Sequence, residues 1–76
     1  MSIINIGICG ASGKMGRALI RSVTDNKKLQ LKGALERDID LNIGKDSGVI
    51  SNIEPTGVDI TSDTNVFFSD CDAIID

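Results

Sequence analysis

The sequence contains no histidine, only two cysteines and no long run of apolar residues. Without histidine, these 76 residues cannot form a His-based metal site or use a histidine as a general base. Cys9 and Cys71 are too few for a disulfide framework and flank apolar stretches, so we expect both to be small core residues. No signal peptide or membrane-length segment is present, which indicates a cytoplasmic protein with no membrane partner.

The sequence also contains fewer basic than acidic residues. Eight Lys and Arg residues against eleven Asp and Glu residues give a net charge of −3 and a pI of about 4.7. This balance argues against nucleic acid as a partner. The basic residues nevertheless gather in and after one predicted helix, which suits either an anionic ligand or a solvated helix face. They are Lys14, Arg17, Arg21, Lys27 and Lys28.

The length of the chain allows one domain at most, covering residues 1–76. An apolar content of 41% with 25% charged residues is ordinary for a globular chain. Residues 72–76 begin like a buried strand, and nothing follows them. We therefore expect the chain to be the N-terminal part of a longer protein.

Two stretches of the first half have the pattern of strands in a parallel sheet. Residues 2–9 are nearly all apolar, as in a strand that is buried on both faces. Residues 29–36 carry leucine and glycine at alternate positions. With a helix between them, these stretches form a βαβ unit whose crossover should be right-handed.

The helix between these strands is predicted over residues 12–25. Ser12 is the expected N-cap, because its hydroxyl can accept from backbone N–H groups of the first turn. Met15, Leu19 and Val23 recur every four residues and form the apolar stripe expected to pack on the sheet. We expect this helix to cover one face of the sheet and the other face to lack its usual helices.

The second half of the sequence is less regular. Residues 37–57 are rich in Gly, Asp and Asn, which predicts a long polar connection with one helical turn near Leu41. Residues 58–61 and 72–76 are predicted to be the third and fourth strands. The last of these would be an open edge of the sheet, so we expect the isolated chain to associate with itself or to swap strands.

A short helix is predicted over residues 63–70, with Asp63 as its cap and with Val66 and Phe67 facing inward. Taken together, these elements predict the α/β class. The expected fold is a partial Rossmann-type parallel sheet of about four strands with one main helix.

Three glycines follow the first predicted strand at a spacing of three, Gly10, Gly13 and Gly16. In a nucleotide-binding turn, the first lets the chain leave the strand sharply and the second lets phosphate oxygens approach the backbone. The third lets the helix pack closely. The helix N-terminus then offers free N–H groups to a pyrophosphate, and Lys14 and Arg17 add positive charge. The alternative is a tight turn that binds no nucleotide.

Glu36 and Arg37 end the second predicted strand, 20 residues beyond Gly16. A carboxylate there can accept from the adenosine ribose hydroxyls, which favours NADH. An adjacent arginine can pair with a 2′-phosphate, which favours NADPH. The pair together suggests that either cofactor is accepted, whereas the alternative is an ordinary exposed charged pair.

Two further motifs are incomplete. A phosphate-binding P-loop would need glycine and a hydroxyl residue where the chain has Ile8 and Met15. The acidic run after residue 37 starts like a calcium loop, but Ile43 and Val49 stand where glycine and the closing glutamate belong. We predict no metal site and, without a convincing acid, base or nucleophile, no catalytic residue in this chain.

These motifs resemble the N-terminal part of the dihydrodipicolinate reductases, also called 4-hydroxy-tetrahydrodipicolinate reductases. The resemblance rests on Gly-Ala-Ser-Gly-Lys-Met-Gly-Arg at 10–17 and on Gly-Ala-Leu-Glu-Arg at 33–37. It continues through Ile-Gly-Lys-Asp-Ser-Gly at 43–48, Thr-Gly-Val at 56–58 and Asp-Ala-Ile-Ile-Asp at 72–76. It spans most of these residues but only the first part of a family member.

The resemblance implies an enzyme of bacterial lysine and diaminopimelate synthesis that uses NADH or NADPH to reduce a cyclic dipicolinate precursor. Such enzymes are usually cytoplasmic homotetramers. It also implies that the catalytic motif, the substrate-binding residues and the tetramer-forming domain lie beyond residue 76, so this chain alone should be inactive. The cofactor-binding residues that it implies are Gly10, Ala11, Ser12, Gly13, Lys14, Met15, Glu36 and Arg37.

Two other hypotheses remain open on the sequence. One is a non-catalytic nucleotide-binding Rossmann module. The other is a different dehydrogenase or epimerase with the same Gly-x-x-Gly-x-x-Gly loop.

Overall fold

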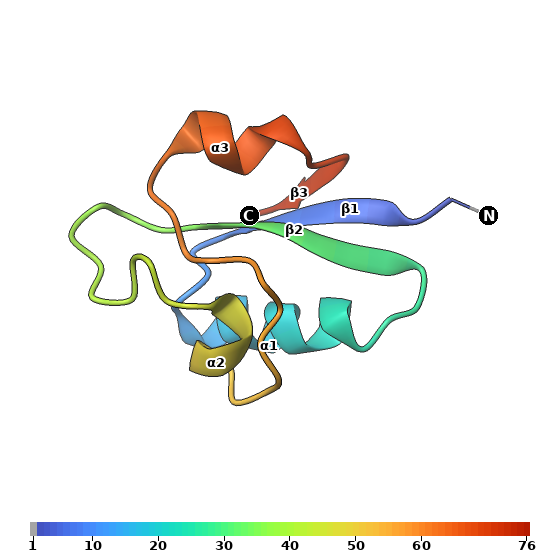
Figure 1. Cartoon of the computed structure of the whole chain (residues 1–76), viewed down its shortest axis with the longest axis horizontal. Coiled ribbons are helices and arrows are strands. Elements are labelled where there is room, and N and C mark those ends of the chain that lie inside the picture. The colour runs from blue at the N-terminus through green and yellow to red at the C-terminus, as the bar shows by residue number, and fades with distance from the viewer. Residues whose placement is uncertain (1) are drawn as a thin grey trace.

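The structure, a computed structural model, describes residues 2–76, and within them it contains three strands and three helices (Figure 1). The strands are β1 (Ile4–Cys9), β2 (Leu29–Leu35) and β3 (Ala73–Ile75). The helices are α1 (Lys14–Thr24), α2 (Ser47–Ile50) and α3 (Thr64–Ser69). None of the helices in this described part is long and apolar enough to cross a bilayer.

The strands form one parallel sheet in the order β2-β1-β3, with β1 in the centre. Ile4 pairs with Leu29 at one end of the β1–β2 ladder, and Cys9 pairs with Leu35 at the other. β3 pairs only with the middle of β1, from Ile6 to Ile8. The expected α/β class, with a partial Rossmann-type parallel sheet and one main helix, is confirmed.

The third strand, expected over residues 58–61, is reduced to a single parallel bridge between Leu35 and Thr61. The residue before Thr61 is already engaged elsewhere, since the backbone N–H of Ile60 donates to the carbonyl of Lys45 at 2.8 Å. Residues 58–60 instead lie against the polar connection, where Asp59 forms an antiparallel bridge with Asp46, and only Thr61 joins β2.

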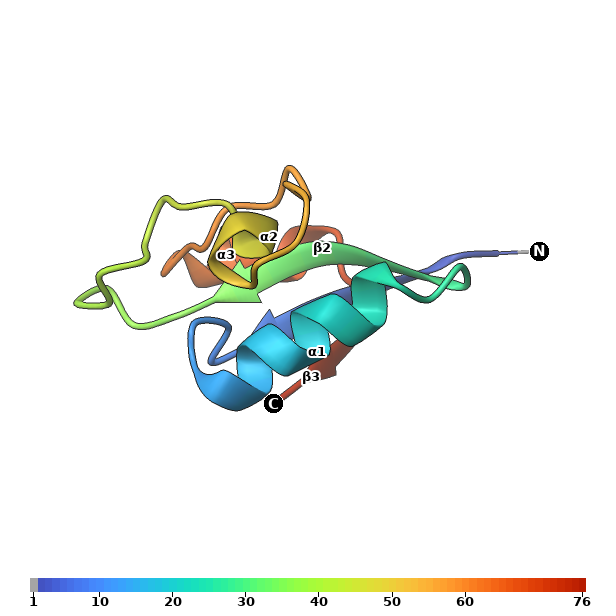
Figure 2. The ribbon, with the colours of Figure 1, turned by 90° about the horizontal axis from the view of Figure 1, so that it is seen from below.

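Helices cover both faces of the sheet: α1 and α2 lie on one side and α3 lies on the other (Figures 1 and 2). The chain crosses from β1 to β2 in one direction and from β2 to β3 in the opposite direction. Crossovers of the same hand therefore place α1 and α3 on opposite faces. The expectation that the second face would lack a helix was wrong, because α3 covers it with Phe67, which is only 1% exposed.

Two of the three positions predicted for the buried stripe of α1 are shifted by one residue. Its buried residues are Gly16, Ile20 and Val23, whereas Met15 is 73% exposed. The shift arises at the start of the helix, where Gly16 rather than Met15 packs against the turn after β1. Val23 was predicted correctly, and Leu19 packs at the margin of the core.

The cap of α3 follows the prediction, while one of its two inward residues does not. Asp63 accepts hydrogen bonds from the N–H groups of Asn65 and Val66 at 2.9 and 3.2 Å. Phe67 is buried, but Val66 is 60% exposed, because a helix of six residues turns only a narrow face toward the sheet. Near Leu41 the chain forms hydrogen-bonded turns rather than a helix, and the helical turn lies later, at α2.

The main core lies between the sheet and α1. Isoleucine dominates it, as expected of a buried parallel sheet, and small alanines fill the places where backbone segments meet. Its members are Ile6, Ile8, Ala11, Ile20, Val23, Leu31, Ala34 and Ile60.

Candidate functional site

The turn between β1 and α1 is held against the end of β2. Gly10 has a positive φ of 65°, a left-handed conformation that glycine adopts without strain. The N–H of Gly13 donates to the carbonyl of Gly10 at 3.1 Å, and the N–H of Ala11 donates to the carbonyl of Leu35, also at 3.1 Å. Because Ala11 is fully buried, the turn is fixed in position by β2.

Gly16 is required for the close approach of α1 to this turn. A Cβ placed on Gly16 would overlap the carbonyl oxygen of Gly10 and would lie 2.7 Å from the Cα of Ala11. These obstacles are backbone atoms, which cannot rotate away as a side chain can. The third glycine of the motif therefore permits close packing of the helix, and the contact is with the turn after β1.

The N-terminus of α1 is left open, unlike the starts of the other two helices. Asp46 and Asp63 cap α2 and α3 with their carboxylates, whereas the α1 cap is Gly13, which has no side chain. The first turn of α1 carries no acidic residue. Ser12, the predicted cap, does not cap the helix, because its hydroxyl is bonded elsewhere. The first N–H groups of α1 thus have no capping acceptor and can receive an anion.

Glu36 reaches back from the end of β2 to the glycine turn. Its Oε2 accepts a hydrogen bond from the backbone N–H of Ser12 at 3.1 Å and another from the Ser12 hydroxyl at 2.9 Å. Arg37, the next residue, is exposed, and its backbone N–H donates to the other carboxylate oxygen of Glu36 at 3.2 Å. The structure therefore brings the two separate parts of the predicted site together.

Asp40 is a member of this cluster that the sequence did not reveal. Its Oδ2 accepts from the Ser12 hydroxyl at 2.6 Å, and its Oδ1 accepts from the backbone N–H of Asn42 at 2.8 Å. These two hydrogen bonds, the first above all, lower the pKa of Asp40 below its ordinary value. The only sequence signal was the Asp-x-Asn pattern, which is typical of a turn and says nothing about a contact 28 residues away.

The remaining predicted residues form an open surface beside this cluster. Gly13, Lys14 and Met15 are all exposed. Two hollows of about 740 and 570 Å³ lie elsewhere, one beside the second half of α1 and the other along β2 below α3. Neither is lined by a predicted site residue. Because Gly13, Lys14 and Met15 are exposed, a ligand at the turn would lie across the carboxyl end of the sheet.

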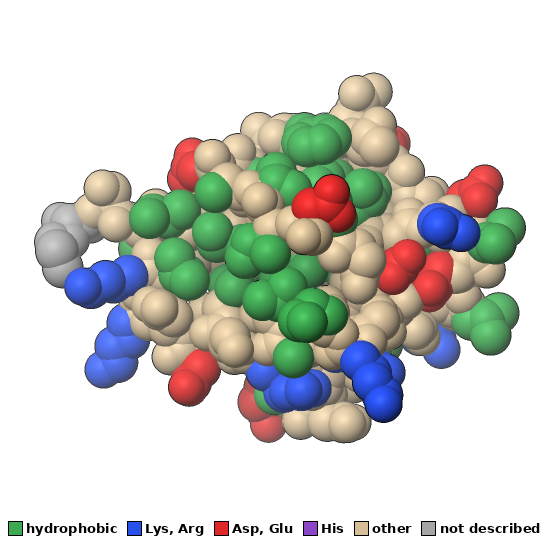
Figure 3. All heavy atoms as spheres, turned by 180° about the vertical axis from the view of Figure 1, so that it is seen from behind, with side chains coloured by type: hydrophobic (Ala, Val, Ile, Leu, Met, Phe, Trp, Pro, Cys, Tyr) green, Lys and Arg blue, Asp and Glu red, His purple; other side chains and the backbone are tan. Residues whose placement is uncertain are grey.

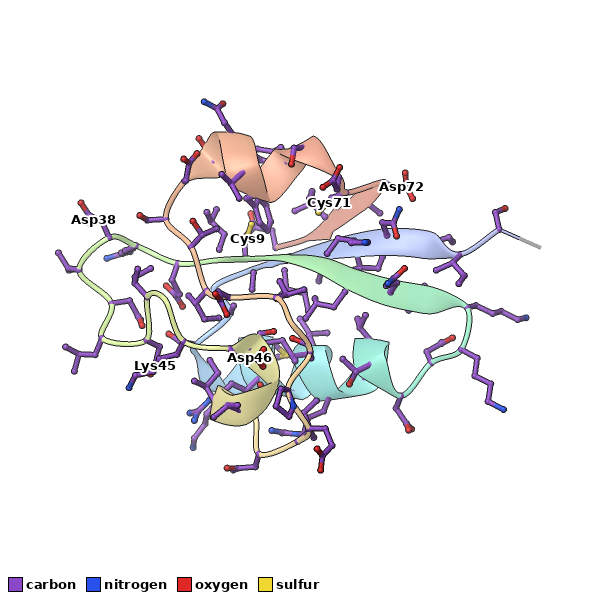
Figure 4. All side chains as sticks on the ribbon, in the orientation of Figure 1. Cys9, Asp38, Lys45, Asp46, Cys71 and Asp72 are labelled. Atoms are coloured by element: carbon purple, nitrogen blue, oxygen red, sulfur yellow. The ribbon has the colours of Figure 1, made fainter. Side chains whose placement is uncertain are left out.

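The two cysteines do not form a reactive site. Burial raises the pKa of both thiols, and nearby carboxylates raise it further. Cys71, which is labelled in Figure 4, donates its S–H to the carbonyl of Phe67 at 3.1 Å. At neutral pH both therefore remain protonated thiols, which are poor nucleophiles. Among residues 2–76, no group of three or more His, Cys, Asp or Glu side chains is placed to hold a metal ion.

This arrangement suits a dinucleotide. The open N–H groups of α1 and the bare backbone of Gly13 match a pyrophosphate, and Glu36 offers a carboxylate to a ribose. The fold and the site together define a Rossmann-type α/β domain, with its glycine turn between the first strand and the first helix.

Comparison with known proteins gives the family. The family model described as "Dihydrodipicolinate reductase, N-terminus" matches residues 4–76. The chain therefore belongs to the dihydrodipicolinate reductase family and has its N-terminal, dinucleotide-binding domain.

Individual relatives agree with this assignment. The chain is 39% identical over 74 residues to the 4-hydroxy-tetrahydrodipicolinate reductase of Pelobacter propionicus, an alignment that covers 97% of this chain and 28% of the relative. It is 42% identical over 73 residues to the protein of the same name from Burkholderia lata, covering 96% of this chain and 27% of the relative. The chain thus spans little more than a quarter of the length of these relatives.

Proposed function

We propose that the chain binds the adenosine ribose and pyrophosphate of NADH or NADPH. The residues that do so are Gly10, Ala11, Ser12, Gly13, Lys14, Met15, Glu36 and Arg37. We further propose that it serves the reductase for which its relatives are named, in lysine and diaminopimelate synthesis. Of the three hypotheses from the sequence, membership in the family favours this one.

Each residue would contribute binding or orientation. The pyrophosphate would lie over Gly13 and accept from the first N–H groups of α1, with Lys14 supplying a mobile positive charge. Glu36 would accept from the ribose hydroxyls, and Arg37 would pair with a 2′-phosphate where one is present. When bound, the nicotinamide end of such a cofactor supplies a hydride to the substrate.

The observation that carries this proposal is the contact of Glu36 with the backbone N–H of Ser12. It joins the end of β2 to the glycine turn, and these two segments must lie side by side if one ligand is to span them. An isolated glycine turn or an isolated charged pair would not require that contact.

The wider context of the proposal comes from the family resemblance. The dipicolinate-type substrate, the catalytic residues and the homotetramer contacts would belong to parts of the protein outside residues 1–76. The chain alone would then bind cofactor without reducing anything. A cytoplasmic location is proposed on the same basis.

The binding proposal can be tested by NMR titration of the ¹⁵N-labelled chain with ADP-ribose, which carries the adenosine and pyrophosphate but no nicotinamide. We expect the amide shifts to concentrate in residues 10–16 and 36–37. Glu36→Gln should weaken binding about tenfold, because a hydrogen bond to a charged group is lost. Glu54→Gln removes an equal charge at an exposed position away from the turn and serves as the control. Saturating ligand without shifts at the turn would refute the site.

The reductase proposal needs a separate experiment. The chain can replace the corresponding part of the Pelobacter propionicus relative, with NADH and NADPH oxidation then assayed with 4-hydroxy-tetrahydrodipicolinate. We expect the chimaera to turn over. A folded chimaera that binds either cofactor but oxidises neither would contradict the assignment.

A further inference from the structure

The turn that follows β2 folds back toward the glycine turn. The N–H of Asp40 donates to the carbonyl of Arg37 at 3.0 Å, and the N–H of Asn42 donates to Oδ1 of Asp40 at 2.8 Å. These two bonds fix both the backbone and the side chain of Asp40, which is half-buried. Its second oxygen, Oδ2, is thereby held 2.6 Å from the Ser12 hydroxyl.

The hydroxyl of Ser12 has a single proton and lies within hydrogen-bond distance of two carboxylates. Its Oγ lies 2.6 Å from Asp40 Oδ2 and 2.9 Å from Glu36 Oε2, and both of these oxygens are acceptors only. One proton cannot satisfy both bonds at full strength. The shared hydroxyl therefore leaves two negatively charged groups close together with fewer donors than they can use.

A ligand with hydroxyl groups would supply the hydrogen-bond donors that the two carboxylates lack. A ligand with more negative charge would instead be repelled by them. The 2′- and 3′-hydroxyls of an unmodified ribose supply two O–H donors at adjacent atoms. A 2′-phosphate replaces one of these donors with a dianion, which two carboxylates a few ångströms away repel. Arg37 can offset part of that repulsion, but it is exposed, so solvent screens its charge.

Building on the function proposed above, we infer that Asp40 determines cofactor specificity, favouring the unphosphorylated ribose of NADH over the 2′-phosphate of NADPH. Arg37 and Asp40 then act in opposite directions on the same phosphate position. The preference of the site follows from their balance rather than from Glu36 and Arg37 alone.

The test compares the dissociation constants of ADP-ribose and 2′-phospho-ADP-ribose by NMR titration, a method that also detects millimolar binding. Asp40→Asn keeps the shape of the side chain and removes its charge. We expect it to shift the ratio of the two constants about tenfold toward the phosphorylated ligand. Asp40→Ser, which keeps an acceptor for the Asn42 N–H, should shift the ratio in the same direction, so the test does not depend on one variant being folded.

The matched control is Asp38→Asn, which makes the same change of charge two residues earlier. Asp38 is exposed and lies at the outer end of the loop after β2 (Figure 4). In Asp38→Asn the ratio of the two dissociation constants should stay within about twofold of the ratio in the parent chain, because a solvated charge is screened. If Asp38→Asn and Asp40→Asn shifted the ratio equally, net charge alone would explain the effect and the inference would be overturned. Equal weakening of both ligands by Asp40→Asn would overturn it as well.

Failure of the underlying function gives a different result. If the unaltered chain bound neither ligand at its glycine turn, the proposed dinucleotide site itself would be refuted, and this inference with it. If the unaltered chain bound both ligands and Asp40→Asn left their ratio unchanged, only the role of Asp40 would be refuted.

Discussion

Gly7 and Gly33 are partners across β1 and β2, and α3 packs on the sheet at this point, where neither residue has a side chain. A Cβ on Gly7 would lie 2.9 Å from Cζ of Phe67, and a Cβ on Gly33 would lie 2.9 Å from Cδ1 of the same ring. The pair therefore sets how closely α3 can approach the sheet.

We expect Gly33→Ala to lower the free energy of unfolding by about 1–3 kcal/mol, the usual cost of overfilling a packed interface. The added methyl group would also lie 3.0 Å from the backbone oxygen of Phe67, which cannot rotate away. Urea denaturation followed by circular dichroism measures the change. Gly13→Ala is the control, because its Cβ would meet nothing closer than 3.5 Å. Equal stability of the two variants would show that α3 does not depend on the glycine pair.

Asp46 stabilises the start of α2 and the chain that returns beside it (Figure 4). Its carboxylate accepts from the backbone N–H groups of Gly48, Val49, Thr56 and Gly57 at 2.7 to 3.2 Å. We expect Asp46→Ala to cost about 1–2 kcal/mol of stability, since α2 loses its N-cap and four backbone donors lose their acceptor. Asp38→Ala, at an exposed position in the same connection, should be nearly neutral.

The same carboxylate makes the stability depend on pH. Burial alone would raise the pKa of Asp46, but the four backbone donors together outweigh it and hold the pKa below the ordinary value. A carboxyl group whose pKa falls on folding stabilises the fold above its unfolded pKa, about 3.9 for Asp. That contribution is lost as the pH falls through the lower, folded pKa. Thermal unfolding from pH 6 to pH 2 should therefore show a smaller loss of stability in Asp46→Asn than in the parent chain.

Arg37→Ala should weaken binding of the phosphorylated ligand more than that of the unphosphorylated one. The guanidinium can pair with a 2′-phosphate, but a ribose hydroxyl offers it no opposite charge. We expect a loss of about tenfold for 2′-phospho-ADP-ribose and less than about twofold for ADP-ribose. Lys32→Ala removes the same charge from an exposed position within β2 and should affect both ligands equally. An equal loss of both ligands in Arg37→Ala would contradict its assigned role.

The isolated chain should associate with itself through the edge formed by β3. This strand pairs with β1 on one side only, and Figure 3 shows apolar side chains gathered on the face seen from behind, where β3 lies. Phe68 is 54% exposed and Ile74 is 37% exposed. Sedimentation should show a concentration-dependent increase in mass, which Ala73→Lys should suppress by placing a charge on the exposed edge. A compact monomer at millimolar concentration would refute this expectation.

The first βαβ unit was predictable because its apolar pattern and glycine turn are both local in the sequence. The buried face of α1 was not, because Gly16 rather than Met15 packs against the turn. In the same way, the strand over residues 58–61 was lost to backbone bonds with the polar connection. Both errors come from contacts between distant backbone segments, which side-chain periodicity does not record.

The candidate site was predictable in its parts but not in its connections. The order of strand, glycine turn and helix points to Gly10 and Gly13, and the end of the next strand points to Glu36. That Ser12 would bond Glu36 and Asp40 instead of capping α1 depends on how the loop after β2 folds back. Sequence spacing does not determine the path of this loop. Two hydrogen bonds between residues within the loop fix it.

The central position of β1 has a consequence for how the chain is made. During synthesis β1 emerges first, yet its two neighbours in the sheet come from residues 29–35 and from residues 73–75. One ladder can close early, over a short loop, whereas the other must wait for almost the last residues described. Parallel pairing over long separations is slow. On the ribosome, therefore, β1 and β2 with α1 would assemble first, and the sheet would be completed only when β3 has been synthesised.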